Sequence, residues 1–270
     1  MTTPTLGEII VYPVKSLDPH DTIERVTVES DGGLSYDRAF ALFDADGSYI
    51  NGKNDRRIHR IRSWFDPKSG RLTLRDDRES DPDPEAFDID DTAAIESWFE
   101  ERLGEPVEVR RDDTGGFPDD TLASGPTLIS RATIETVAGW FDDIEPAEMK
   151  RRLRPNLVIE DVPAFWEDRL YRDRETAVAV RIGECTFLGS NPCQRCAVPL
   201  RDPQTGVETP GFRETFVEKR KTTLPEWVDR SWYDHYFRLM VNTFVPQETT
   251  GRSLAVGDSV EILGERPYPT

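Results

Sequence analysis

The stretch NPCQRCAVPLRDPQTG, residues 191–206, places two cysteines three positions apart and follows them with a proline-flanked aspartate turn that ends in glycine. A Cys-x-x-Cys spacing has three common uses: half of a zinc site, a redox dithiol, or a loop that presents one reactive thiolate. Each use demands different neighbours, so the flanking sequence helps to separate them.

A zinc site is disfavoured because a closed site needs four ligands. Besides Cys193 and Cys196, the chain has only Cys185 and three scattered histidines, with no second paired cluster. A redox dithiol normally opens a helix after a strand. Here prolines stand on both sides of the pair and disfavour a helix start.

Two interpretations of the pair remain, namely ordinary buried cysteines and a single working thiolate. On frequency alone, a free cysteine is more often a small core residue. Arg195 stands beside Cys196, however, and a neighbouring guanidinium favours a thiolate and can also hold an anion. A soft thiolate on a loop suits a soft transition metal whose other ligands are anionic.

The composition indicates a folded protein. The chain of 270 residues is long enough for one large or two modest domains with buried cores. Three cysteines crowded into twelve positions do not form a secreted disulfide framework. No run approaches the roughly 18 apolar residues of a membrane helix, and the N-terminus lacks the features of a signal peptide. We therefore expect a cytoplasmic protein with no membrane partner.

The formal net charge is −18, and the acidic residues are spread along the whole chain. Such a surface is a poor partner for nucleic acid, which we therefore exclude. A solvated acidic exterior is a better interpretation than an acidic binding site. We interpret it as adaptation to the salt-rich cytoplasm of a halophile, where screening removes the self-repulsion.

The N-terminal part is rich in short strand patterns, which suggest a meander or a small barrel. A helix is predicted over 93–104, because its apolar residues recur at helical spacing and Gly104 follows them. Asp91 or Thr92 can cap that helix. The strands are predicted at 7–14, 21–30, 38–44, 70–77 and 106–111.

The stretch 112–120 has the turn residues and charge of a linker, so we place a domain boundary there, with domains at 1–112 and 113–270. After it, a strand end and a helix are predicted in 126–141 and a second helix in 145–154. The segments 212–221 and 226–245 stay open between helix and strand. Further strands are predicted at 155–160, 177–189 and 258–264.

The combination of PCQRC with DPQTG, after the strand that begins VRIGE and before VGDSVEILG, resembles the MOSC domain. This module is shared by the C-terminal part of molybdenum cofactor sulfurases and the amidoxime-reducing enzymes. The N-terminal motifs VYPVKSL, YDRAFALFDADG and INGK are similar to the β-barrel domain that precedes MOSC in the amidoxime-reducing branch. The resemblance implies a mainly β fold with some helices (α+β), in which an N-terminal β-barrel-like domain packs on a MOSC β-barrel domain.

The resemblance also implies a role for one thiol. In the family, the second cysteine of the motif is the protein's ligand to the molybdenum of the molybdopterin cofactor, so Cys196 is the expected metal ligand and catalytic residue. Cys193 is then a neighbour, and Cys185 is expected in the core.

Further family positions imply contacts to the pterin phosphate. Lys15 and Ser16 come from PVKS and Arg38 from DRAF, whereas Ser130 offers a hydroxyl at a helix start, which suits an anion. Asp202 is expected to shape its turn by accepting backbone hydrogen bonds. The expected cofactor-binding residues are Lys15, Ser16, Arg38, Ser130, Arg154, Asn156, Arg195 and Asp202.

Two segments depart from the family's usual pattern. AVPLRDP stands where relatives often have a Thr-Thr-Val-Asp run, which affects the substrate side. SLDPHD lacks the glycine that usually follows the lysine–serine pair, which affects only the shape of that loop.

The resemblance implies a molybdenum-dependent oxidoreductase that reduces small N-hydroxylated, amidoxime-like substrates. The sequence has no further cysteines for an iron–sulfur cluster, so electrons would come from a separate ferredoxin or flavoprotein. Two alternatives stay open: a sulfur carrier with a persulfide on Cys196, and a non-catalytic molybdopterin-binding module. Pyridoxal phosphate is a further cofactor associated with this family, but Lys15 suits a phosphate better than a Schiff base.

Overall fold

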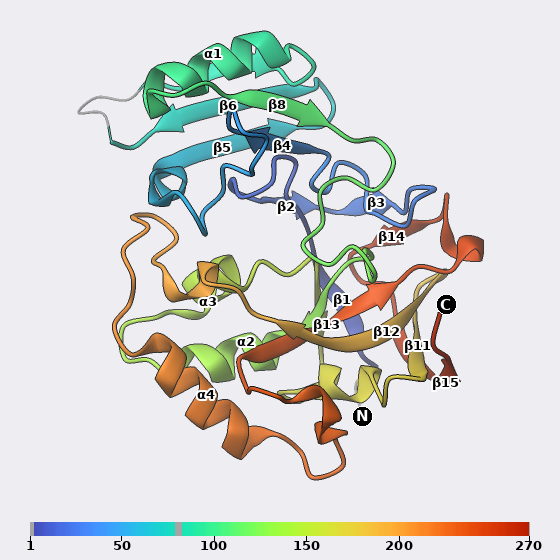
Figure 1. Ribbon diagram of the computed structural model, residues 1–270. Coiled ribbons are helices and arrows are strands. Elements are labelled where there is room, and N and C mark those ends of the chain that lie inside the picture. The colour runs from blue at the N-terminus through green and yellow to red at the C-terminus, as the bar shows by residue number, and fades with distance from the viewer. Residues whose placement is uncertain (1–2, 79–82, 270) are drawn as a thin grey trace.

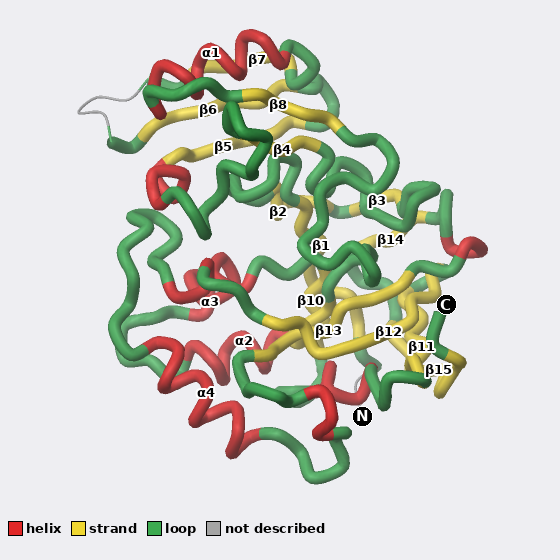
Figure 2. Tube along the Cα trace, viewed as in Figure 1, coloured by secondary structure: helices red, strands yellow, loops and turns green. Residues whose placement is uncertain are grey.

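The computed structural model describes residues 3–78 and 83–269 and consists mainly of strands (Figures 1 and 2). An upper lobe in Figure 1 carries α1 with β4 to β8, and a lower lobe holds a large curled sheet with α2, α3 and α4 at one side. The predicted fold class is therefore confirmed: a mainly β protein with some helices, in which one β lobe packs on another.

The lower lobe is organised around one eight-stranded sheet. All its neighbouring strands run antiparallel except β9 and β10, which are parallel. The sheet curls so that the start of β1 contacts the segment that leads into β15. Two backbone hydrogen bonds join them: Leu6 N donates to Asp258 O and Val260 N donates to Pro4 O, both at 2.8 Å. The strand order is β15 (Val260–Pro267), β11 (Thr176–Ile182), β12 (Cys185–Gln194), β13 (Arg238–Phe244), β9 (Leu128–Ser130), β10 (Leu157–Glu160), β1 (Thr5–Val11) and β2 (His20–Ile23).

Three helices cover one side of this sheet: α2 (Arg131–Ala138), α3 (Pro146–Leu153) and α4 (Phe212–Thr223). Their apolar faces share one buried cluster with residues of the sheet. Members of that cluster include Ile134, Val137, Met149, Phe212, Phe216 and Leu239.

The upper lobe has a separate core, built by α1 (Thr92–Leu103) against short sheets. In β6 the burial alternates along the strand, which is the pattern of a sheet with one face on a core. The sheets are β5 (Ile61–Asp66), β6 (Arg71–Asp76) and β7 (Glu85–Asp88), and the pair β4 (Phe40–Phe43) and β8 (Glu108–Arg111); beside the large sheet, β3 (Arg25–Thr27) pairs with β14 (Ser253–Ala255).

Short 3-10 segments connect these elements at five places in the described chain. One of them, η1, leads directly into β5 and forms part of the wall between the lobes. They are η1 (Arg56–Arg60), η2 (Trp166–Leu170), η3 (Val198–Leu200), η4 (Arg230–Trp232) and η5 (Gln247–Thr249).

Most predicted elements are present, and the differences lie mainly in the strands. The stretch predicted as one strand over 21–30 contains parts of two, because β2 ends at Ile23 and β3 begins at Arg25. The stretch predicted as one strand over 177–189 also contains parts of two, because the chain turns between β11 and β12. The sequence did not predict β5, where burial does not alternate regularly, nor the short strands β7 and β14. Of the two open segments, the first became helix α4, and the second ends in strand β13.

The boundary between 112 and 113 stays a prediction. β1 and β2 precede it in sequence yet belong to the eight-stranded sheet, so the chain enters the lower lobe first, builds the upper lobe and then returns. Within residues 3–78 and 83–269, no helix combines the length and apolarity needed to cross a lipid bilayer.

Gly116 holds two segments of the upper lobe together. Its φ is +63°, and an added Cβ would lie 2.6 Å from the carbonyl oxygen of Arg38. The next residue, Phe117, donates its N–H to that same oxygen at 2.8 Å. A side chain at 116 would therefore push apart the loop that carries Arg38.

We expect Gly116→Ala to lower the free energy of unfolding by on the order of 2 kcal/mol, from the left-handed backbone and the close contact. Urea denaturation measures it. Gly139→Ala is the matched control, because Gly139 has φ −64° and its added Cβ would lie 3.5 Å from the nearest atoms. Equal effects of the two substitutions would contradict the close-packing argument.

Candidate cofactor-binding site

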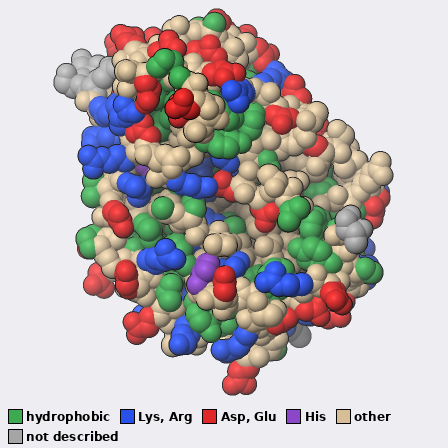
Figure 3. Space-filling view, in the orientation of Figure 1, with side chains coloured by type: hydrophobic (Ala, Val, Ile, Leu, Met, Phe, Trp, Pro, Cys, Tyr) green, Lys and Arg blue, Asp and Glu red, His purple; other side chains and the backbone are tan. Residues whose placement is uncertain are grey.

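A cavity of about 530 Å³ lies between the two lobes. Its walls come from the loops after β1 and β4 and from η1 in the upper lobe, from the segment 118–127, and from α3, β12 and β13 below. In the space-filling view, Lys and Arg side chains gather at the hollow between the lobes (Figure 3). The volume is in the range of sites for small molecules and cofactors.

The charge of this cavity is opposite to that of the whole chain. Its lining includes ten lysines and arginines against four aspartates, whereas the whole chain has 34 basic and 52 acidic residues. Such a concentration of positive charge is suited to an anionic ligand. The basic lining residues are Lys15, Arg38, Lys53, Arg62, Arg151, Arg152, Arg154, Arg195, Arg201 and Arg238, and the acidic ones are Asp18, Asp37, Asp119 and Asp120.

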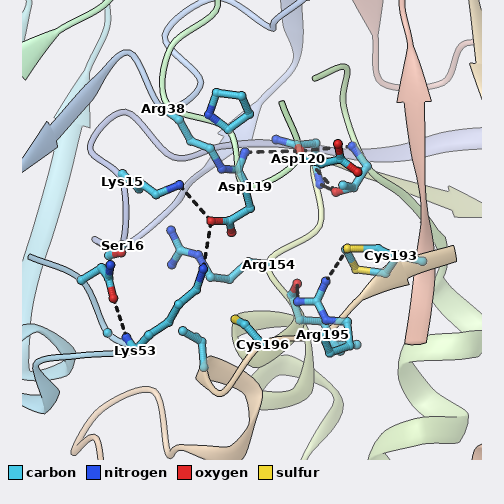
Figure 4. Close-up of a pocket in the computed structure, with 18 of the residues that line it drawn as sticks. Lys15, Ser16, Arg38, Lys53, Asp119, Asp120, Arg154, Cys193, Arg195 and Cys196 are labelled. Carbon is cyan, nitrogen blue, oxygen red and sulfur yellow. Dashed lines mark hydrogen bonds and ion pairs between the residues drawn. The ribbon is translucent and has the colours of Figure 1, made fainter. Parts of the chain in front are cut away.

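Asp119 joins two lysines from different loops. Its Oδ1 lies 2.9 Å from Lys15 Nζ and 3.3 Å from Lys53 Nζ (Figure 4), and Lys15 Nζ also donates to Phe117 O at 2.7 Å. Burial alone would raise the pKa of Asp119, but the two ammonium groups outweigh burial and hold that pKa well below its usual range. Burial lowers the pKa of Lys15, although Asp119 opposes the change.

Lys53 connects this cluster to the cysteine loop. Burial alone would lower the pKa of Lys53, but the negative charge of Asp119, together with that of Cys196 when its thiol is ionised, outweighs burial and raises it. The close-up shows Lys53 and Cys196 on the same side of the cavity (Figure 4). A positive charge from the upper lobe therefore lies near the thiol of the lower lobe.

Arg38 and Arg154 lie against one buried tyrosine. Their guanidinium carbons are 4.8 Å and 4.0 Å from the centre of the Tyr12 ring, which are cation–π distances. Arg38 pairs with Asp37, and Arg154 Nη1 donates to Leu17 O at 2.9 Å. Burial lowers the pKa of Arg154, and the nearby charge of Arg38 adds to that effect. An anion bound between these groups would relieve their repulsion.

Asn156 helps to fix the position of Arg38. Its Oδ1 accepts from Arg38 Nη1 at 3.4 Å and from the N–H and hydroxyl of Thr127, both at 3.2 Å. Its Nδ2 donates to Ile10 O at 3.0 Å. Asn156 is therefore held from three strands or loops, and it orients Arg38 toward the cavity.

Unusual backbone conformations concentrate in this lining. Seven non-glycine residues of the described chain have positive φ, and four of them line the cavity: Ser16 (75°), Arg38 (56°), Arg154 (54°) and Met240 (71°). Arg154 takes the left-handed position at the end of α3, where glycine is the common residue. Backbone strain of this kind is typical of functional sites.

The three cysteines have distinct environments. Cys193 and Cys196 line the cavity and are partly exposed, whereas Cys185 is buried within β12, where burial raises its pKa to about 11. Arg195 Nη1 lies 3.1 Å from Cys193 Sγ, and Arg195 Nη2 donates to Leu153 O at 2.7 Å (Figure 4). The guanidinium that the sequence places beside Cys196 therefore contacts Cys193 instead.

Two predicted residues lie outside the cavity lining. Ser130 is fully buried and caps α2, with its hydroxyl accepting from Thr133 N at 3.0 Å. The helix start is thus where the sequence predicts it, but the hydroxyl faces the protein interior. Asp202 accepts from the N–H groups of Gln204 and Thr205 at 2.9 and 2.7 Å, so it shapes the turn as expected.

The structure brings the other predicted residues together around the cavity: Lys15, Ser16, Arg38, Arg154, Asn156, Arg195 and Cys196 all line it. The sequence reasoning did not single out Lys53, Asp119 or Arg201, which line it too. Lys53 stands in the INGK motif, which was a usable signal. Asp119 and Arg201 had none, because each lies in a charged loop that resembles an ordinary solvated surface.

Sequence comparison gives the family. A model of the MOSC N-terminal beta barrel domain matches residues 3–90, and a model of the MOSC domain matches residues 127–261. The chain belongs to the MOSC domain family. The MOSC match includes both cysteines of the opening motif, and the N-terminal match includes Lys15, Ser16 and Arg38.

A curated relative supports a connection to the molybdenum cofactor. The MOSC chain is 25% identical over 238 residues to the molybdenum cofactor sulfurase of Oryza sativa subsp. japonica. The match covers 71% of this chain and 27% of the rice protein, so the chain spans about a quarter of that relative's length. In the described part of the chain, no cluster of three or more His, Cys, Asp or Glu side chains could hold a metal by itself.

A buried network replaces the anion site that the sequence suggests at Ser130. Glu167 Oε2 accepts from Thr133 Oγ1 at 3.0 Å and from Ser130 N at 3.3 Å. Burial raises the pKa of Glu167 to about 7, and the charge of the neighbouring Asp168 adds to that effect. The start of α2 is therefore occupied by a carboxyl of the protein itself.

This raised pKa predicts a pH-dependent stability. The protonated carboxyl stabilises the fold fully below the unfolded value near 4.5, and that contribution is lost as pH rises through 7. We expect Glu167→Gln, which imitates the protonated form, to match wild type at pH 4.5 and to exceed its unfolding free energy by on the order of a few kcal/mol at pH 8. Urea denaturation at both pH values measures this difference. A constant difference would contradict the assignment.

Proposed function

We propose that this protein binds the molybdenum cofactor in the cavity between its lobes, with Cys196 as the thiolate ligand, and reduces small N-hydroxylated substrates. One observation carries the proposal: a partly exposed thiol lies in the wall of a ligand-sized cavity whose lining is rich in lysine and arginine. The acidic character of the rest of the chain makes that lining a local adaptation to an anion.

The residues present fit the cofactor's phosphate. Lys15, Arg38 and Arg154 supply positive charge from two lobes, and the Ser16 hydroxyl lies in the same lining. Charge-assisted hydrogen bonds to phosphate are among the stronger polar interactions in proteins. Asn156 has its amide engaged with Arg38, so it acts through that guanidinium.

When bound, the cofactor supplies the two-electron chemistry that removes an oxygen atom from a substrate. The chain supplies ligation through Cys196, orientation through the arginines, and positive charge near the thiolate through Lys53. Cys193 has a different task, because its thiol accepts the guanidinium of Arg195. That contact fixes Arg195 at the cavity wall.

Electrons come, in this proposal, from a ferredoxin or flavoprotein. A sulfur carrier is the second candidate, since the curated relative is named a molybdenum cofactor sulfurase. In that case Cys196 would hold a persulfide instead of a metal.

The molybdenum content of cysteine variants tests the ligand. Wild type from a cofactor-competent host should contain close to one molybdenum per chain, and Cys196→Ser should lose almost all of it. Cys193→Ser is the matched control, because its thiol lines the same cavity. Elemental analysis measures the molybdenum of each variant, and pterin fluorescence measures its pterin. Equal losses in the two variants would exclude a single-ligand site, and a persulfide on Cys196 without molybdenum would favour the sulfur carrier.

The phosphate contacts predict a second result. Lys15→Gln or Arg38→Gln should weaken cofactor retention roughly tenfold or more, because each removes a charged hydrogen-bond donor worth about 1.5–3 kcal/mol. Dialysis followed by pterin assay measures retention, and circular dichroism checks that the variants are folded. Lys219→Gln removes the same charge from the exposed side of α4 and should have no effect. Unchanged retention in both cavity variants would remove the phosphate assignment.

A further inference from the structure

The cations of the cavity differ in whether a carboxylate neutralises them. Lys15 and Lys53 share Asp119, and Arg38 pairs with Asp37. Other arginines of the lining have carboxylate partners within 4.0 Å as well. Among the residues that the structure describes, the lining cations with no ion pair are Arg154, Arg195 and Arg201.

Two of these three already have fixed contacts. Arg154 lies on the Tyr12 ring and donates to Leu17 O, within the group proposed for the cofactor phosphate. Arg195 is held by Cys193 and by Leu153 O.

Arg201 is different from them. Its side chain donates from Nη1 to Gly206 O, at 3.1 Å, within its own turn. This bond shapes the turn and leaves the positive charge of Arg201 unneutralised by the described chain.

The turn that carries Arg201 is anchored to the opposite lobe. An added Cβ at Gly206, where φ is +69°, would lie 2.6 Å from Arg56 O, so the turn packs closely on η1. Arg62 Nη2 also reaches Pro203 O at 3.4 Å. Arg201 therefore has a fixed place at the junction of the lobes rather than on a loose loop.

Positive charges crowd together at this junction. Burial lowers the pKa of His59, and the charges of Arg201, Arg154 and Arg62 lower it further. Two carboxylates reach this group. Asp18 Oδ1 lies 2.9 Å from Arg62 Nη1 and 4.0 Å from Arg151 Nη2, and Asp77 Oδ2 lies 3.5 Å from Arg62 Nε. Both carboxylates contact Arg62 or Arg151, and neither is paired with Arg201, so the positive charge at Arg201 favours the binding of an anion.

We propose that Arg201 forms a second anion subsite in the cavity and binds a carboxylate or phosphate group of the substrate. The inference rests on the proposed function and narrows its substrate class to N-hydroxylated molecules that carry a negative charge. Arg201 stands in AVPLRDP, the segment that departs from the family pattern, so this preference belongs to this chain's own sequence. Arg suits the task because its planar fork binds an oxyanion through two hydrogen bonds.

The test compares two probes that differ in one charge: benzamidoxime and 4-carboxybenzamidoxime. Calorimetric titration of the cofactor-loaded protein should show at least tenfold tighter binding of the carboxylate. Arg201→Gln should reduce this preference to about twofold or less and leave benzamidoxime binding unchanged. Lys219→Gln, an equal change in net charge on the exposed side of α4, should keep the full preference.

Equal binding of the two probes by wild type, or a preference that survives Arg201→Gln, would overturn the inference. Loss of cofactor from the Arg201→Gln protein, measured as molybdenum and released pterin, would overturn it too, because Arg201 would then hold a phosphate of the cofactor. Arg201-dependent binding without turnover of either probe would support the anion subsite and refute the proposed reductase activity.

Discussion

The repulsion between positive charges around one small cavity is the constraint on which this structure depends. Guanidinium and ammonium groups a few ångströms apart repel one another strongly where protein replaces water. Aspartates placed between these groups reduce the repulsion, such as Asp37 beside Arg38 and Asp119 between Lys15 and Lys53. These carboxylates keep the lining compact, while they leave a net positive charge for an anion.

The need to hold several positive side chains close together also explains the unusual backbone conformations of the lining. Arg38 and Arg154 both have left-handed conformations, and both guanidinium groups lie against the ring of Tyr12. Tight packing around them, for example Gly116 against Arg38 O, holds these conformations in place. A ligand that enters the cavity therefore meets side chains that are already oriented, which reduces the entropy cost of binding.

The sequence predicts features that depend on local pattern. The cap and period of α1, the strands β4 and β6, and the helix start at Ser130 follow from residues within a few positions of each other. The arrangement of charges in the cavity does not follow from local pattern, because Lys15 and Asp119 are 104 positions apart in the sequence. The contact of Arg195 with Cys193 could have been predicted, because residues two apart on an extended chain point to the same side.

The closure of the large sheet bears on how the chain folds. Val260 donates a backbone hydrogen bond to the carbonyl oxygen of Pro4 across more than 250 positions of sequence, and β1 pairs with β10 from the other half of the chain. Contacts of such long sequence separation form late and slow the search for the native state. During synthesis, the start of β1 therefore cannot complete its pairing until the segment around Val260 has been made.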